Sequence, residues 1–117
     1  MAYHADAVML WCFDARFSVA LDSLIKKKKL KMPDIIKVAG GAKDIKHPYL
    51  LSQIEKSFRL HHPKEIYLMV HEKCGAYGGR AYDQKKELAR SGKILESFLK
   101  KKGIRAKIHK VFERLPR

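Results

Sequence analysis

Residues 6–12, Asp-Ala-Val-Met-Leu-Trp-Cys, set the architecture that we expect for the whole chain. Nearly every residue in this run is apolar, which is typical of a strand buried on both faces of a parallel sheet. Residues 65–71, Glu-Ile-Tyr-Leu-Met-Val-His, have the same character. Residues 34–41 indicate a shorter strand that runs into a glycine turn. Apolar and polar side chains alternate over 104–112, which predicts an edge strand with one wet face.

Apolar residues recur at helical spacing between these strands, which predicts helices over 17–30, 48–61 and 82–102. A proline follows each of the first two segments and Gly103 follows the third, so each helix has a defined end. Strands and helices therefore alternate along the chain. This alternation predicts a single α/β domain over residues 1–117, a three-layer, open and mainly parallel sheet of strand order 2-1-3-4 with flanking helices.

The composition is that of a globular protein. The chain has 117 residues, which suffice for one domain, and 46% of them are hydrophobic. No apolar run approaches the roughly 18 residues that a membrane span needs, and the N-terminus lacks the basic start and long apolar stretch of a signal peptide. We therefore expect a cytoplasmic protein, in which the two cysteines are metal ligands or free thiols rather than a disulfide.

The net charge of +14 is unusually high. Such a basic excess favours contact with nucleic acid or another polyanion, whereas the alternative is a lysine-rich chain whose charges coat solvated helix faces. We favour the second interpretation, because base-stacking aromatic residues do not interleave with the basic ones. Lys26–Lys29 allow the same two kinds of interpretation. The first is a solvated helix end whose positive charge complements the helix dipole, and the second is a phosphate-binding patch.

Three side chains that bind metals lie at or just beyond the ends of the two buried strands. Cys12 and His71 each end one strand, and Cys74 follows after a tight turn. In a 2-1-3-4 order the first and third strands are neighbours, and open α/β sheets hold their sites where the strand order reverses. Two thiolates and one imidazole leave a tetrahedral ion one open position, as in a catalytic zinc site. The alternative is a purely structural role for each, since buried cysteine commonly packs as a small hydrophobe.

Asp14 and Arg16 follow Cys12 at alternate positions. In an extended backbone these three side chains point the same way. The Asp14 carboxylate would then lie beside the open coordination position and pair with Arg16 in fork geometry. If Arg16 released it, Asp14 could instead close the site as a fourth ligand. For the remaining histidines we expect exposed or locally bonded rings: His4, His47, His61, His62 and His109.

Cys-x-Asp-x-Arg from residue 12, an Ala-Gly turn, and His-x-x-Cys-Gly-Ala from residue 71 together resemble the β-class carbonic anhydrases, over about residues 6–80. The resemblance implies that Zn2+ is bound by Cys12, His71 and Cys74. It also implies a catalytic dyad beside the zinc-bound water, made of Asp14 and Arg16. Members of this family usually form homodimers or higher homo-oligomers, with active sites close to the subunit interface.

The chain departs from the family pattern in two places. The family usually has Arg-Asn-Ala-Gly-Asn where this chain has Lys-Val-Ala-Gly-Gly, residues 37–41. The chain also begins almost directly at its first strand, without the N-terminal helices that in the family embrace a neighbouring subunit and help to wall the pocket. We therefore expect a short, divergent member that keeps the zinc ligands and has a different pocket.

The implied activity is hydration of carbon dioxide to bicarbonate by a zinc-bound hydroxide, which exists near neutral pH because zinc acidifies its water. Candidates for the pocket wall are Phe13, Val38, Gly75 and Tyr77, whereas Phe17 is expected in the core. A second enzyme hypothesis keeps the same site but hydrolyses carbonyl sulfide or carbon disulfide. A third, from a different class, is a non-catalytic module in which zinc stabilises the fold and the basic surface binds nucleic acid.

Overall fold

Four parallel strands form the centre of the structure, a computed structural model that describes residues 3–115. They are β1 (Val8–Cys12), β2 (Asp34–Val38), β3 (Glu65–His71) and β4 (Lys107–Glu113). Their spatial order is β2-β1-β3-β4, and each neighbouring pair is parallel. This confirms the predicted open sheet of order 2-1-3-4. The terminal residues of the domain predicted over 1–117 lie outside the described residues.

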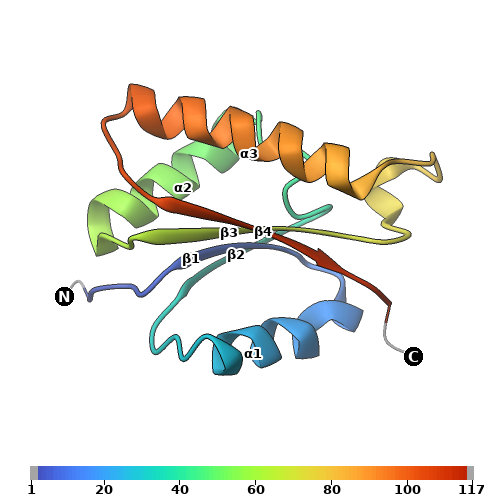
Figure 1. Cartoon of the computed structure of the whole chain (residues 1–117), viewed down its shortest axis with the longest axis horizontal. Coiled ribbons are helices and arrows are strands. Elements are labelled where there is room, and N and C mark those ends of the chain that lie inside the picture. Colours follow the sequence, from blue (N-terminus) through green and yellow to red (C-terminus); the bar gives the residue numbers. More distant parts are fainter. Residues whose placement is uncertain (1–2, 116–117) are drawn as a thin grey trace.

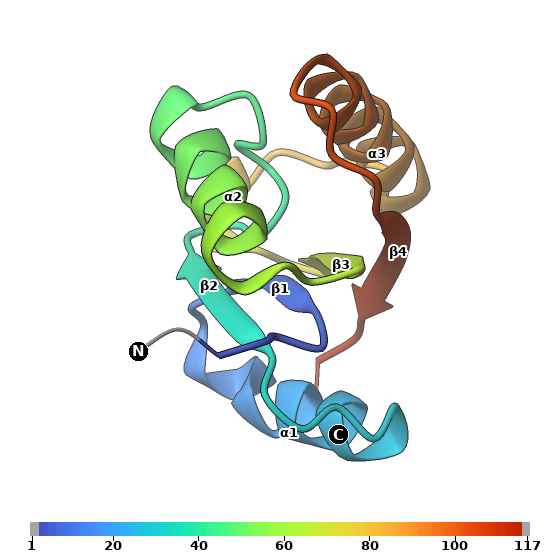
Figure 2. The ribbon, with the colours of Figure 1, turned by 90° about the vertical axis from the view of Figure 1, so that its left-hand side faces the viewer.

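Helices cover both faces of the sheet (Figure 1, Figure 2). One face carries α1 (Ser18–Lys27), and the other carries α2 (Pro48–His61) and α3 (Gln84–Lys101). Two short 3-10 turns, η1 (Ala15–Phe17) and η2 (Gly75–Tyr77), lie shortly after the ends of β1 and β3. The predicted three layers are therefore present. Within residues 3–115, none of the helices combines the length and the apolar character that crossing a bilayer requires.

The sheet separates two apolar clusters, and β1 contributes to both of them. Val8 and Leu10 belong to the cluster under α2 and α3, whereas Met9 and Trp11 belong to the cluster on the α1 side. All four side chains are fully buried. The run is apolar along its length because both faces of its strand are covered. Phe17 is also fully buried in the second cluster, as predicted.

Local sequence decides where α2 and α3 begin, the two helices that share one face of the sheet. Pro48 occupies the first turn of α2, and the Nδ1 atom of His47 accepts a hydrogen bond of 3.2 Å from the Tyr49 N–H. Asp83 caps α3 in the same way, because its carboxylate accepts a hydrogen bond of 3.0 Å from the Lys86 N–H. This cap also fixes the position of Tyr82, the residue just before Asp83.

The C-terminal strand differs from the prediction. β4 is an edge strand, as expected, but it begins at Lys107 rather than at residue 104, and it has no fully wet face. The half-buried ring of His109 stacks on Tyr67 of β3 with centroids 4.3 Å apart, and its Nε2 lies 2.8 Å from Glu65 Oε1. The prediction of a wet face was wrong because the large Tyr67 ring of the neighbouring strand covers it.

Candidate metal centre

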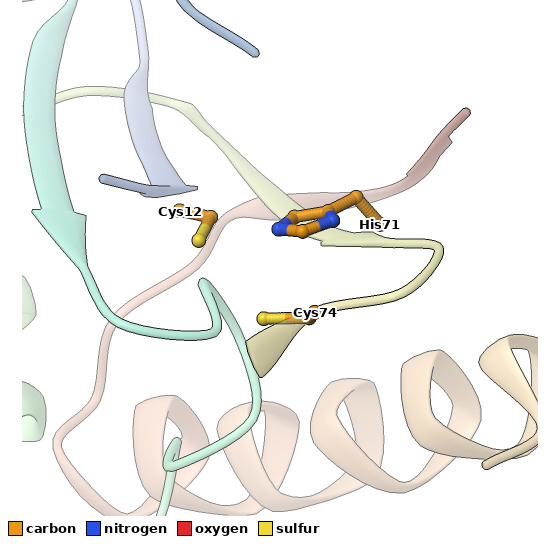
Figure 3. A group of neighbouring side chains, drawn as sticks. All are labelled: Cys12, His71 and Cys74. Atoms are coloured by element: carbon orange, nitrogen blue, oxygen red, sulfur yellow. The ribbon is translucent and has the colours of Figure 1, made fainter. Parts of the chain in front are cut away.

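The ends of β1 and β3 bring three side chains with metal-binding atoms together. β1 pairs in parallel with β3, with Val8 opposite Ile66, so the carboxyl ends of the two strands lie side by side. Cys12 is the last residue of β1, His71 is the last of β3, and Cys74 follows a short turn later. One ligand atom from each lies within 4.8 Å of the others, and all three residues are buried. Figure 3 shows the two thiols and one ring nitrogen facing a common space.

The His71 ring is oriented to offer a lone pair to this space. Its Nδ1 lies 2.7 Å from the carbonyl oxygen of Glu72. Because a carbonyl can only accept a hydrogen bond, Nδ1 carries the proton and Nε2 keeps a free lone pair. Nε2 is buried and has no hydrogen-bond partner among the described residues. A buried polar atom of this kind calls for a partner, and a cation held together with the two thiols would supply it.

The donor set and its spacing suit Zn2+. Zinc binds cysteine sulfur at about 2.3 Å and histidine nitrogen at about 2.0 Å in tetrahedral geometry, which places ligand atoms roughly 3.5–3.8 Å apart. That spacing falls within the 4.8 Å limit observed here. Burial raises the pKa of the Cys74 thiol, and the nearby Cys12 and Asp14 raise it further. Cation binding at this centre would therefore release protons, since thiolate is the form of cysteine that binds metals.

Asp14 and Arg16 form the predicted pair, but the backbone between them is not extended. Residues 15–17 form the turn η1, and Asp14 Oδ1 caps it by accepting a hydrogen bond of 3.0 Å from the Arg16 N–H. The guanidinium folds back onto the same carboxylate, with Nε 3.0 Å from Oδ1 and Nη2 2.6 Å from Oδ2. These hydrogen bonds lower the pKa of Asp14 to about 2. The expected alternation is wrong, because a tight turn rather than strand geometry aligns the two side chains.

Aromatic packing fixes the plane of the His71 ring. The ring stacks on Phe17, with centroids 4.0 Å apart and planes 26° from parallel. Phe17 is held in turn, since its carbonyl accepts a hydrogen bond of 3.0 Å from the indole N–H of Trp11. The imidazole is thus confined on one face by packing and at Nδ1 by a hydrogen bond. Little reorganisation is needed for Nε2 to bind an ion.

Gly41 allows a loop to cross the strand ends beside the centre. The loop that follows β2 is tied to β3 by a hydrogen bond of 2.9 Å from the Ala42 N–H to the Met69 carbonyl. At Gly41 φ is +58°, and a Cβ atom there would lie 2.3 Å from the Met69 carbonyl oxygen. It would also lie 3.3 Å from the backbone nitrogen of Cys12. The sequence signalled a glycine turn here, but not this close approach.

The four predicted pocket residues lie in different surroundings. Gly75 borders a hollow of about 520 Å³ next to Cys74. Tyr77 is only 5% exposed and packs in the same cluster as the cysteines. Val38 lines a separate hollow of about 190 Å³, and Phe13 is 64% exposed to solvent. The structure therefore places Gly75 and Tyr77 near the centre and does not gather all four residues around one cavity.

Tyr82 touches the centre although nothing in the sequence indicated it. Its hydroxyl donates a hydrogen bond to the carbonyl oxygen of His71 and accepts one of 3.1 Å from the N–H of Cys74. Its ring stacks on Tyr77, with centroids 3.8 Å apart and planes 12° from parallel. One side chain thus contacts the backbones of two candidate ligands.

Comparison with known proteins identifies the fold. No protein-family model and no curated protein sequence matches the chain. Among solved structures, carbonic anhydrase from Streptococcus mutans superposes with a TM-score of 0.70 at 14% identity, over 97% of this chain and 78% of that one. The apo form of a carbon disulfide hydrolase superposes with a TM-score of 0.55 at 12% identity, over 96% and 76%. These two likenesses show that the fold is β-carbonic-anhydrase-like, as the sequence motifs predicted.

Proposed function

We propose that this chain binds Zn2+ and hydrates carbon dioxide to bicarbonate, a lyase activity of the carbonic anhydrase type. The observation that carries the proposal is the buried cluster of Cys12, His71 and Cys74, with the His71 Nε2 atom unpaired, at the strand ends of this fold. Three protein ligands are the usual complement of a catalytic zinc, which keeps its fourth position for water or substrate. When bound, Zn2+ lowers the pKa of water to about 7 and so makes hydroxide available at neutral pH.

Asp14 is proposed to orient that nucleophile. A carboxylate offers about four acceptor directions. In this chain Arg16 binds both carboxylate oxygens: its backbone N–H and Nε donate to Oδ1, and its Nε and Nη2 donate to Oδ2. The carboxylate lies close enough to the centre to raise the pKa of the Cys74 thiol, and we propose that it also accepts a hydrogen bond from an O–H there, which the shared Nε contact leaves room for. Because the pKa of Asp14 is about 2, its carboxylate is ionised at neutral pH and acts only as an acceptor.

Arg16 is proposed to keep the fourth metal position open. The charge-assisted fork holds the carboxylate against the guanidinium, which opposes its movement onto a cation. Consistent with this, the group of metal-capable side chains found within residues 3–115 contains Cys12, His71 and Cys74 without Asp14. A permanently closed site would instead favour a structural zinc in a basic module that binds nucleic acid.

Hydrolysis of carbonyl sulfide or carbon disulfide is the second candidate. It is supported by the likeness to a carbon disulfide hydrolase at a TM-score of 0.55. The same three ligands and the same acceptor would serve, because these molecules are linear carbon electrophiles like carbon dioxide. Turnover of each substrate by one zinc-loaded preparation separates the two activities.

We also propose that the chain works in the cytoplasm as a homodimer or a higher homo-oligomer. Both cysteines are free thiols, a state that a reducing compartment maintains. Phe13 is 64% exposed directly beside Cys12, and Ile35 on the edge strand β2 is 45% exposed. A second copy that covers Phe13 would add to the wall near the centre, and one that pairs with β2 would also cover Ile35. Sedimentation equilibrium of the zinc-loaded chain tests this assembly.

The decisive experiment combines metal analysis with a stopped-flow carbon dioxide hydration assay. We expect one zinc per chain and pH-dependent hydration for the unmodified protein. Cys74→Ala should lose the metal, because two donors rarely hold zinc. Asp14→Ala should keep the zinc and lose most of the turnover, whereas Asp22→Ala, which removes an exposed carboxylate on α1, should match the parent. Full activity of Asp14→Ala would remove Asp14 from the mechanism, and a zinc-free active protein would overturn the proposal.

A further inference from the structure

We infer that Tyr82 is a positioning residue for the metal centre, holding the backbones of His71 and Cys74 at the spacing that a shared cation requires. This inference rests on the proposed function, since it concerns the same three ligands. Tyr82 itself has no atom in the cluster of ligand atoms. Its effect would be exerted through the peptide groups of two of them.

The hydroxyl of Tyr82 closes the turn between the two ligands. It donates to the His71 carbonyl and accepts from the Cys74 N–H at 3.1 Å, so a single oxygen spans the two ends of the turn. The turn contains Lys73 at φ +51°, a left-handed conformation that a residue with a side chain adopts at a cost. The two hydrogen bonds help to keep the backbone in this conformation, and with it the direction in which each ligand points.

The Tyr82 ring is fixed independently of the turn that it holds. It stacks on the buried Tyr77 ring at 3.8 Å between centroids. The next residue, Asp83, is the N-cap of α3 and accepts a hydrogen bond from the Lys86 N–H. The hydroxyl is therefore anchored both through its ring and through the start of an eighteen-residue helix. Such outer contacts commonly decide how well a preformed set of ligands matches a metal.

The other groups that hold His71 in place act on its ring rather than on the turn that leads to Cys74. Phe17 stacks on the His71 ring, and the Glu72 carbonyl fixes its Nδ1 atom. Both of these contacts act on the imidazole. Within residues 3–115, the Cys74 N–H has one recorded hydrogen-bond acceptor, the Tyr82 oxygen. The Cys74 carbonyl is held separately by a hydrogen bond of 3.2 Å from the Tyr77 N–H, so loss of the Tyr82 hydroxyl would loosen the peptide between Lys73 and Cys74 on the side that faces His71.

The test is the Zn2+ affinity of Tyr82→Phe, measured by competition with a chromophoric chelator. The variant keeps the stacked ring and removes both hydrogen bonds. We expect zinc binding to weaken ten- to a hundred-fold, the range found when outer-shell partners of metal ligands are removed. Tyr49→Phe, which changes a tyrosine that is 68% exposed on α2, is the matched control and should bind zinc like the parent.

Two further measurements separate positioning from general stability. The visible absorption of the Co2+-substituted protein reports ligand geometry, and we expect Tyr82→Phe to change its band positions, which a loss of stability alone would not do. In the metal-free parent, the Cys74 amide should exchange slowly with solvent because of its hydrogen bond to Tyr82. Unchanged zinc affinity and an unchanged cobalt spectrum in Tyr82→Phe, or fast exchange of that amide in the parent, would overturn the inference while leaving the proposed function intact. A parent protein that binds no zinc would overturn both.

Discussion

Replacing Gly41 by alanine should lower the free energy of unfolding by about 3–6 kcal/mol. Three terms contribute. The left-handed backbone at φ +58° costs a residue with a Cβ about 1–2 kcal/mol. The new Cβ would lie 2.3 Å from the Met69 carbonyl oxygen, and relieving an overpacked contact of this kind typically costs about 1–3 kcal/mol. Moving the loop would also strain the hydrogen bond from the Ala42 N–H to the same carbonyl, worth about 1 kcal/mol.

Gly78→Ala is the matched control for Gly41→Ala. Gly78 has a similar φ of +64°, but nothing lies within 4 Å of the position of its Cβ. It should therefore lose only the conformational term, about 1–2 kcal/mol. Urea denaturation of both variants, followed by far-UV circular dichroism and by the fluorescence of the buried Trp11, gives the two losses.

The difference between the two glycine variants isolates the close approach to β3. If Gly41→Ala is no less stable than Gly78→Ala, then the loop does not press on the Met69 carbonyl and the reasoning fails. A Gly41→Ala protein that folds should also bind Zn2+ more weakly than the parent. The added Cβ lies 3.3 Å from the Cys12 nitrogen, so relief of the clash displaces the end of β1 that carries the thiol.

The ion pair beside the centre predicts a pH dependence. The pKa of Asp14 is about 2 in the folded chain, below its ordinary 3.8, so its ionised form stabilises the fold above about pH 4 and this contribution is lost as the pH falls to about 2. Asp14→Asn should therefore flatten the decline of the unfolding free energy over that window, measured by urea titrations at several pH values; an unchanged decline would contradict it. Ser57→Ala should cost about 1–2 kcal/mol more than the exposed helical control Ser97→Ala, because the buried Ser57 hydroxyl donates a hydrogen bond of 2.7 Å to Asp34. Equal stability of the two serine variants would show that this hydrogen bond contributes nothing.

The convergence of Cys12, His71 and Cys74 could be predicted because it depends on topology and on types of residue. Alternating strands and helices favour a parallel sheet, and a parallel sheet brings the carboxyl ends of its strands to one edge. Cys12 and His71 end neighbouring strands and therefore meet. Their convergence required no knowledge of side-chain packing, only the strand order 2-1-3-4.

The surroundings of the cluster could not be predicted in the same way. An extended backbone was expected to align Asp14 with Arg16, but the turn η1 places the two side chains together instead. Both geometries satisfy the same residue spacing, so spacing alone does not distinguish them. The prediction of a wet face on the last strand was wrong for a related reason, since the length of the Tyr67 side chain on the neighbouring strand determines what covers His109.

The amino-acid sequence by itself determined the elements and their order, because the spacing of apolar residues and the placement of prolines and glycines act within a few residues along the chain. It also placed two thiols and an imidazole at strand ends. Only the tertiary structure decided which other groups hold that cluster. The Tyr82 hydroxyl reaches His71 across eleven residues, and Gly41 passes against the backbone of β3. Such contacts depend on how closely two segments approach in space, and no local pattern of residues encodes that distance.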